Sequence, residues 1–235
     1  NRIRKDITMS TSQSLATLLG FGVDVLDIDR PFSNAWIMRA RIDIADEPSP
    51  PLGPFSCVFD DGESTIEYSG TLIHSQADTG DAYVIGVGGQ GKLSTFLQGV
   101  DYSQPQPRTI AQDIIAACGE VIGDLSGLDS LARIEPVYSC IKGLASRQLQ
   151  ALCNILGVRW YTRPDGGIVI GPPTWPTYAG DPFIVHNPNE HGTIIAEPNL
   201  PDIEPGMVVG GFRIASVHYY LDSNGLSAHL GVANE

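Results

Sequence analysis

The chain is poor in basic residues. Its 235 residues include 14 Lys and Arg against 27 Asp and Glu, which gives a formal net charge of −13 at pH 7. The acidic residues are spread along the whole sequence. Because proteins hold nucleic acid largely by neutralising its phosphates with Lys and Arg, this deficit argues against binding nucleic acid in that way. It is compatible with a surface that nucleic acid passes without sticking.

Long apolar runs are also missing, although 42% of the residues are hydrophobic. No stretch approaches the roughly 20 consecutive apolar residues that a membrane-spanning helix needs. The first residues, NRIRKDITMSTSQ, lack the apolar segment of a secretory signal. We therefore expect no membrane span and no signal peptide.

Cysteine is scarce and scattered. The spacing contains no Cys-x-x-Cys pair, whereas a metal site needs clustered ligands. Two cysteines lie in apolar helix patterns and one in a strand pattern, where free Cys behaves as a small hydrophobic residue. We expect reduced, buried thiols and a chain that folds in the cytoplasm. The four residues are Cys57, Cys118, Cys140 and Cys153.

What the sequence has in quantity is glycine (26) and proline (17), together with many Thr, Val and Ile. This composition favours short strands joined by turns. Every second residue from Trp36 to Ile44 is apolar, which predicts a half-buried strand with its arginines outward. A meander follows at residues 55–59, 64–75 and 82–87. Short strands are expected at 183–185 and 193–195, and a last hairpin at 207–220 and 226–232 with its turn at 222–225.

Two helices are predicted between these strands. Leucines at three- and four-residue steps predict a helix over 145–156, with Ser146 as N-cap and Gly157 as the residue that ends it. A tight hairpin of 158–161 and 168–170 follows directly. A second helix is predicted over 110–122 with Thr109 as its cap, and a short one over 92–97. The predicted fold class is therefore α+β with predominantly antiparallel strands.

The segment from Gly86 to Leu93 resembles the phosphate-binding loop G-x-x-x-x-G-K-[ST] and follows a predicted strand. The residue after Lys92 is Leu93, so the hydroxyl that would bind Mg²⁺ is missing. The preceding meander also predicts antiparallel pairing, whereas nucleotide loops belong to parallel sheets. A glycine-rich turn without nucleotide is the favoured interpretation.

Five histidines are possible ligands or bases: His74, His186, His191, His218 and His229. His186 and His191 lie in the proline-rich connection with Glu190, too loosely spaced for a defined metal pair. His218 and His229 fall on opposite arms of the last hairpin and are predicted to face each other as packing residues. Surface or interface histidines are favoured over a site.

No catalytic residue follows from the other reactive side chains. A cysteine nucleophile would need a histidine base nearby in space. Cys140 and Cys153 stay open as nucleophiles only because the sequence does not exclude them, and Cys153 lies on an apolar helix face, which favours a place in the core. Asp60, Asp61 and Asp165 occupy turn patterns. We therefore expect no enzyme activity, and we name no catalytic, cofactor-binding or metal-binding residue and no cofactor.

The order of elements is distinctive. A meander ends in Gly91-Lys92-Leu93, and a Pro-rich spacer from Asp101 to Pro107 leads into the first helix. The helix and hairpin around Leu149-Gln150-Ala151-Leu152 follow, and Pro205-Gly206-Met207-Val208 precedes the last strands. This order resembles the tail baseplate hub family of tailed bacteriophages, which includes late-control D proteins and the hub portion of type VI secretion spikes. The resemblance covers residues 60–235.

The resemblance implies a structural role without enzyme activity. It implies tube-like β-barrel or sandwich domains with a few packed helices. The expected domains are an N-terminal tube-like β domain (1–104), a helical middle region (105–171), and a connection with a closing hairpin that completes a second β domain (172–235). Three copies would adapt a sixfold tail tube to a threefold tip and line a channel with a net negative surface.

The expected partners are two further copies of the chain, a tail tube or distal tail protein above, and a spike, fibre or tip protein below, with DNA passing through unbound. The expected location is the virion tail baseplate, assembled in the host cytoplasm. Two alternatives remain open. One is another tail structural protein, distal or tube-initiating and hexameric. The other is a cell-wall hydrolase or glycan-binding domain with His186, Glu190 and His191 in its site.

Overall fold

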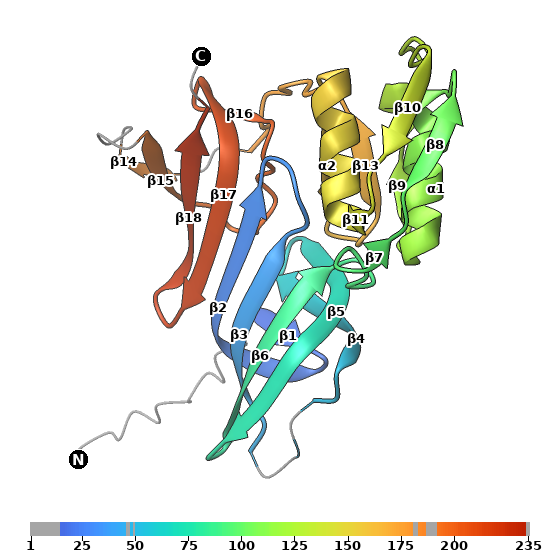
Figure 1. Cartoon of the computed structure of the whole chain (residues 1–235). Coiled ribbons are helices and arrows are strands. Elements are labelled where there is room, and N and C mark those ends of the chain that lie inside the picture. The colour runs from blue at the N-terminus through green and yellow to red at the C-terminus, as the bar shows by residue number, and fades with distance from the viewer. Residues whose placement is uncertain (1–14, 46–47, 49, 181–182, 187–191, 234–235) are drawn as a thin grey trace, which may run out of the picture.

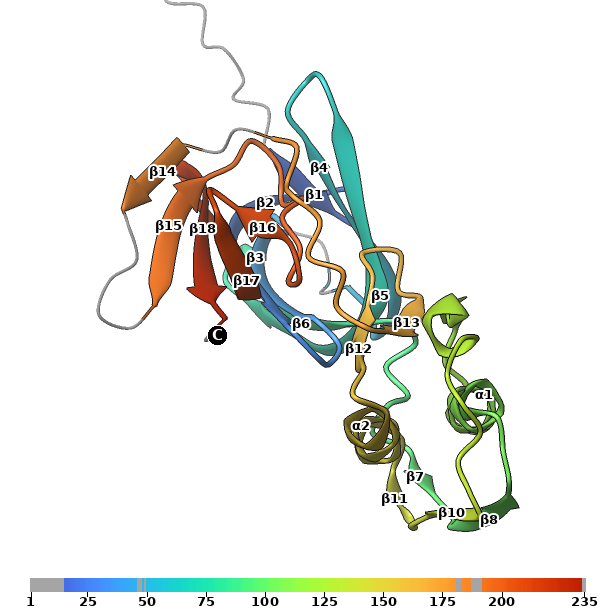
Figure 2. The same ribbon diagram turned by 90° about the horizontal axis from the view of Figure 1, so that it is seen from above.

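Six strands of the N-terminal half close into a barrel (Figures 1 and 2). The computed structural model describes residues 15–45, 48, 50–180, 183–186 and 192–233. Around the barrel the strands follow the order β1-β4-β5-β6-β3-β2, and β2 pairs with β1 to close the ring. All neighbours in the ring are antiparallel. The strands are β1 (Ala16–Leu18), β2 (Phe21–Pro31), β3 (Ile37–Asp43), β4 (Gly53–Asp60), β5 (Thr65–Asp78) and β6 (Asp81–Gly88).

Alternating side chains explain why these segments form a barrel. In and around β3, the apolar residues at positions 36, 38, 40, 42 and 44 are all buried, and Arg39 and Arg41 point outward. The same alternation recurs in β2, β4 and β6. A sheet with one apolar face hides that face most completely when it curls closed, which also removes its free edges. The predicted strand at 36–44 and the predicted meander are confirmed.

The last strands of the chain extend the barrel sheet. The long strand β17 (Phe212–Asp222) pairs with the C-terminal half of β2, so that Leu221 lies opposite Leu26 and Tyr219 opposite Ile28. The sheet then continues through β18, β15 and β14. These strands confirm the predicted last hairpin and the two predicted short strands. They are β14 (Phe183–His186), β15 (Thr193–Glu197), β18 (Gly225–Val232) and the two-residue β16 (Val208–Val209), which pairs with β17.

Residues between the barrel and the last strands build a smaller helical part with its own core (Figure 2). Helices α1 (Pro107–Cys118) and α2 (Ala145–Leu156) pack together over the hairpin of β12 and β13. Two short ribbons, β7–β11 and β8–β10, complete it. The remaining elements are β7 (Phe96–Leu97), β8 (Val100–Ser103), β9 (Ile122–Asp124), the 3-10 turn η1 (Ser126–Leu128), β10 (Val137–Cys140), β11 (Gly143–Leu144), β12 (Arg159–Thr162) and β13 (Ile168–Gly171).

The helix ends differ from the predicted ones. Helix α1 begins at Pro107, whose missing N–H costs nothing at a helix start, and ends where Gly119 takes the left-handed conformation (φ 83°). The predicted cap at Thr109 and the predicted end at residue 122 are therefore wrong. In α2 the predicted bounds and the terminating role of Gly157 are confirmed.

The predicted Ser146 cap of α2 is wrong, because backbone carbonyls of an earlier segment accept hydrogen bonds from the first N–H groups of the helix. Ser146 lies inside the first turn, and its N–H donates to the carbonyl of Leu93, while the N–H of Ala145 donates to Thr95. The segment that supplies these carbonyls was itself predicted to be helical at 92–97. It instead forms a turn and enters β7, because its strand pairing with β11 brings it alongside the start of α2.

The predicted fold class, α+β with mainly antiparallel strands and a tube-like barrel, is confirmed. Strands of the first and last thirds share one sheet and one hydrophobic core, and the middle third has a second core. The division at residues 104 and 171 stays a prediction. Across the described ranges, no helix combines the length and apolar character needed to cross a membrane.

Adding one methyl group where the two cores meet should destabilise the protein. A Cβ on Gly88 would stand 2.5 Å from Thr162 Oγ1 and 2.7 Å from the indole nitrogen of Trp36. We expect Gly88→Ala to lower the free energy of unfolding by about 1–3 kcal/mol in urea denaturation. Gly22→Ala is the matched control, because a Cβ there meets nothing within 4 Å. Equal effects of the two variants would contradict the packing described.

Stability should fall at alkaline pH because a buried thiol resists ionisation. Burial raises the pKa of Cys153 from 9.0 to about 12. Between pH 9 and 12 the folded chain keeps a proton that the unfolded chain has lost, so the free energy of unfolding falls as the pH rises. Urea titrations at pH 8 to 11 should therefore show a shallower decline for Cys153→Ala than for the wild type. Parallel declines would show that ionisation of Cys153 does not cause the loss of stability.

Candidate functional site

The glycine-rich loop after β6 holds a carboxylate of this chain. Gly89 and Gly91 have φ values of 78° and 69°, and the backbone N–H groups of Gln90 and Lys92 donate to the Glu120 carboxylate at 2.8 and 2.6 Å. Neighbouring N–H groups aimed at one point make an anion-binding concavity. Because Glu120, the second residue after α1, fills this concavity, the loop fastens the barrel to the helical part.

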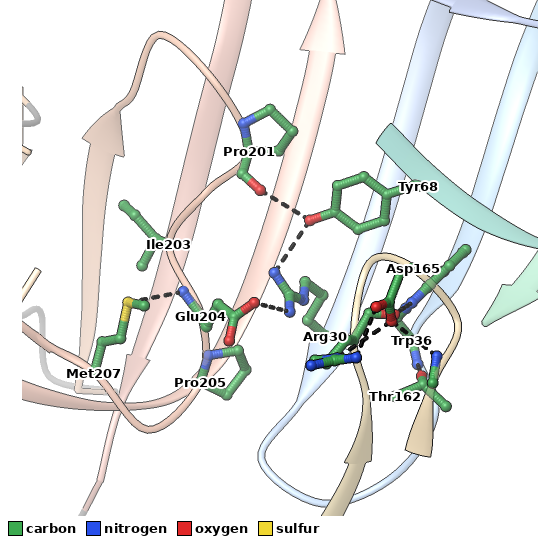
Figure 3. A network of polar contacts seen from close by, with 12 residues as sticks. Arg30, Trp36, Tyr68, Thr162, Asp165, Pro201, Ile203, Glu204, Pro205 and Met207 are labelled. Atoms are coloured by element: carbon green, nitrogen blue, oxygen red, sulfur yellow. Dashed lines mark hydrogen bonds and ion pairs between the residues drawn. The ribbon is translucent and has the colours of Figure 1, made fainter. Parts of the chain in front are cut away.

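A buried arginine ties the barrel to the segment before β16 (Figure 3). Arg30 is 2% exposed, and its guanidinium donates to Tyr68 Oη at 3.1 Å and to Glu204 Oε1 at 3.0 Å. The hydroxyl of Tyr68 donates onward to the carbonyl of Pro201 at 2.8 Å. Burial by itself would lower the pKa of Arg30, but Tyr68 and Glu204 outweigh it and the pKa is raised. The guanidinium therefore stays charged.

The same segment is held from two further sides. Tyr219 of β17 donates its hydroxyl to the carbonyl of Ile203 at 2.8 Å. Arg159 of β12 donates to the carbonyl of Pro205 at 2.8 Å. Barrel, last strands and helical part thus converge on residues 201–205, and each contributes a buried side chain.

Arg159 also lies within a stack of rings. Its guanidinium carbon is 4.6 Å from the ring centroids of both Phe32 and Tyr161. Phe32 stacks in turn on Trp175 at 5.5 Å and 16°, and Arg213 lies over Trp175 at 5.5 Å. Cations over aromatic faces contribute about 0.5–2 kcal/mol each, with the larger values where water is excluded. The stack joins the β2 end, the helical part and the C-terminal third.

The turn of the β12–β13 hairpin is docked against the barrel. Trp36 donates its backbone N–H to Thr162 Oγ1 at 3.2 Å and its indole N–H to the carbonyl of Arg163 at 2.9 Å. Ser69 of β5 donates its backbone N–H to the carbonyl of Pro164 at 2.7 Å. We refer to the contacts of Arg30, Arg159 and Trp36 together as the arginine joint.

The outward face of β6, β3, β2 and β17 carries charge with an acidic surplus. Arg39 pairs with Asp27 at 3.3 Å, and Arg41 lies 3.6 Å from Asp81 and 3.8 Å from Asp24. Asp29 adds a further carboxylate opposite His218. Arg39 and Arg41 are thus matched by carboxylates.

Of the histidines named from the sequence, two are brought together. His218 and His229 are cross-strand partners with ring centroids 6.4 Å apart, as predicted, and His218 Nε2 is 3.4 Å from Asp27. His74 lies beside Tyr83 on the barrel. Glu190, His191 and the side chain of His186 lie outside the described residues. Within the described part of the chain, no group of three or more His, Cys, Asp and Glu side chains is placed to hold a metal ion.

The cysteines are buried, and burial disfavours their ionised form. All four are free and buried, as predicted, and burial raises the pKa of each thiol. A raised pKa disfavours the thiolate, which is the nucleophilic form. Cys140 and Cys153 are therefore poor nucleophiles, and both belong to the core of the helical part.

The turn assignments of Asp60, Asp61 and Asp165 are confirmed by their carboxylates, which accept local backbone N–H groups.

The residues of the arginine joint were missed in the sequence. One signal was present, since Arg30 is in phase with Leu26 and Ile28 along β2 and so lies on the buried face. A charged residue on a buried face requires a partner from elsewhere in the fold. That partner, Glu204, is 174 residues away, and no local pattern points to it.

Solved structures with a similar fold exist, although sequence comparison finds no relative. No model of a known protein family matches the sequence, and no curated protein sequence matches it either. A 43 kDa tail protein of prophage MuSo2 from Shewanella oneidensis superposes with a TM-score of 0.66 at 12% identity, covering 93% of this chain and 96% of that one. A tail protein from Neisseria meningitidis MC58 gives 0.64 at 13% identity, covering 94% and 96%.

Phage tail proteins share this fold. A third similar structure is a component of the Escherichia coli type VI secretion system, itself described as similar to the bacteriophage T4 tail proteins gp27 and gp5. It gives a TM-score of 0.64 at 12% identity and covers 94% of this chain and 77% of that one. At such identities the likeness establishes the fold alone.

Breaking the arginine joint should cost more than breaking a surface ion pair. We expect Glu204→Ala to lower the free energy of unfolding by about 3 kcal/mol, because it leaves the buried guanidinium of Arg30 without its carboxylate. Asp129→Ala is the control, since the Arg108–Asp129 pair is exposed and should contribute less than about 1 kcal/mol.

Removing the stranded charge as well should restore part of the loss. The Arg30→Met/Glu204→Ala double variant leaves no unpaired buried ion, so it should be more stable than Glu204→Ala alone. Urea denaturation of the wild type, Glu204→Ala, Asp129→Ala and the double variant measures the free energy of unfolding of each. A double variant less stable than Glu204→Ala would show that the pair is not the element that holds residues 201–205.

Proposed function

We propose that this chain is a structural component of a phage tail baseplate. In this proposal three copies form a hub that joins a sixfold tail tube or distal tail protein to a threefold spike, fibre or tip protein. The chain acts in the virion tail after assembly in the host cytoplasm, and it performs no catalysis. The observation that carries the proposal is whole-chain likeness in fold to two phage tail proteins, over 93% and 94% of its length.

The architecture suits a ring-forming part. A closed barrel gives each copy a stiff body, and β17, β18, β15 and β14 extend its sheet sideways. The order of this sheet ends at β14, so that in the described part of the chain the outer edge of β14 faces no further strand. An open edge is a surface on which a strand of a neighbouring protein can add.

The outward face of β6, β3, β2 and β17 is the proposed channel wall. DNA moving through a tail must slide past the wall without being held, and phosphate binding requires unpaired cations. Arg39 and Arg41 are engaged by Asp24, Asp27 and Asp81. The net charge of −13 supports the same conclusion.

The copy number of the purified assembly tests the hub proposal. Native mass spectrometry should give a species of three times the 25.2 kDa of one chain. Six copies would instead favour a distal or tube-initiating tail protein. The Glu204→Ala variant provides a control for folding. If it is both less stable and less assembled than the wild type, its loss of assembly reflects the fold rather than the interface.

A further inference from the structure

The β7–β11 and β8–β10 ribbons lie at the end of the helical part that is farthest from the barrel (Figure 2). Residues of these ribbons and of α2 line an apolar groove. Its volume is about 620 Å³. One wall is a single stripe of α2 made of Arg147, Ala151 and Ile155, at four-residue spacing. The other wall is the segment 139–144, made of the end of β10, the connection at 141–142 and β11, with Phe96 beside it.

The apolar residues of this groove are unusually exposed. Ile141 is 80% exposed, Ile155 65% and Phe96 61%. Scattered exposed apolar residues are ordinary, but several around one groove mark a surface that another molecule covers. The same part of the chain has a complete core of its own, so these three side chains are not needed to fill it.

The loop that carries Ile141 is held in place from beneath. The buried side chain of Gln148 donates its amide to the carbonyls of Ile141 at 2.9 Å and of Gln98 at 3.4 Å. Gly99 lies so close to this loop that a Cβ there would be 3.0 Å from the carbonyl oxygen of Cys140. Ile141 is thus presented on a fixed backbone. Binding to a preformed surface avoids the entropy cost of ordering it.

The charge of the groove is opposite to that of the chain. Its lining includes Lys142 and Arg147, and among the described residues that line it there is no Asp or Glu. The chain as a whole has almost twice as many acidic as basic residues. A groove with apolar walls and a basic rim is complementary to an apolar segment that carries carboxylates.

A second copy of this chain does not offer such a segment from its described helices. Helices α1 and α2 turn their apolar faces into their own core. Together they contain a single carboxylate, Asp113. Neither described helix of a second copy thus has the acidic amphipathic character that would complement this groove, which favours a different polypeptide as the occupant.

We propose that this groove binds an acidic amphipathic helix of another protein. The helix lies along the Arg147–Ala151–Ile155 stripe with its apolar side against Ile141, Ile155 and Phe96, in the manner of a helix in a groove. Its carboxylates face Lys142 and Arg147. Ile141, as the most exposed of the apolar residues that line the groove and the one on the fixed backbone, is the central anchor.

Two synthetic probes test this with the full chain. The first is a fluorescein-labelled amphipathic peptide of about four helical turns, with leucines along one side and glutamates elsewhere. The second has lysine in place of each glutamate. Fluorescence anisotropy at about 0.15 M ionic strength, where charges farther away than about 8 Å are screened, should show at least tenfold tighter binding of the acidic probe.

Variants then locate the binding site. Ile141→Ser should weaken the acidic probe at least tenfold, whereas Leu52→Ser, which removes an exposed leucine of the barrel part (63% exposed), should leave it unchanged. The Lys142→Glu/Arg147→Glu double variant should reverse the preference and favour the lysine probe. These side chains are at the surface, so unchanged urea denaturation provides the folding control.

Three results would overturn the proposal. Equal binding of the two probes would show a merely adhesive apolar surface. No binding of the acidic probe would show that the groove does not take such a helix. Dissociation of a homo-oligomer by Ile141→Ser would show that a second copy covers the groove. That last result would overturn the groove proposal while agreeing with a hub made of several copies of this chain, so the two proposals fail separately.

Discussion

The structure depends on two buried arginines that reach the same short segment from different directions. Arg30 in the barrel bonds to Glu204, and Arg159 in the helical part bonds to the carbonyl of Pro205. Tyr68 and Tyr219 hold the carbonyls of Pro201 and Ile203 beside them. Residues 201–205 have no regular structure of their own, so these bonds satisfy backbone groups that would otherwise be buried without partners. Three regions of the chain meet there.

This joint has a mechanical consequence. The barrel and the helical part have separate hydrophobic cores, and separate cores permit relative motion unless the contact between them is specific. Directional bonds from Arg159, Trp36 and the Glu120-filled loop supply that specificity. The proposed hub, which would transmit position from a tube to a tip, needs such a fixed geometry. The acidic outer sheet face and the basic apolar groove are then held at defined places on one body.

The sequence predicted local structure well and long-range contacts poorly. Strict alternation gave the strand at 36–44, and four-residue spacing with a terminal glycine gave the helix at 145–156. Errors arose where backbone groups from distant segments replaced a side-chain signal, as at Ser146, or where pairing with another strand overrode a helical pattern at 92–97. Barrel closure and the Arg30–Glu204 pair join residues far apart in the chain. The barrel was expected only through the resemblance to tail hub proteins, and only the phase of Arg30 along its strand hinted at the buried pair.

The central claim is that this chain occupies the junction between tail tube and tip. Its most direct test is electron cryomicroscopy of an intact tail particle that contains this chain, with the structure fitted into the density. The account predicts a ring of three copies between tube and tip, with the outward face of β6, β3, β2 and β17 toward the channel. Six copies, a position away from the junction, or a channel wall of unpaired Lys and Arg would contradict it.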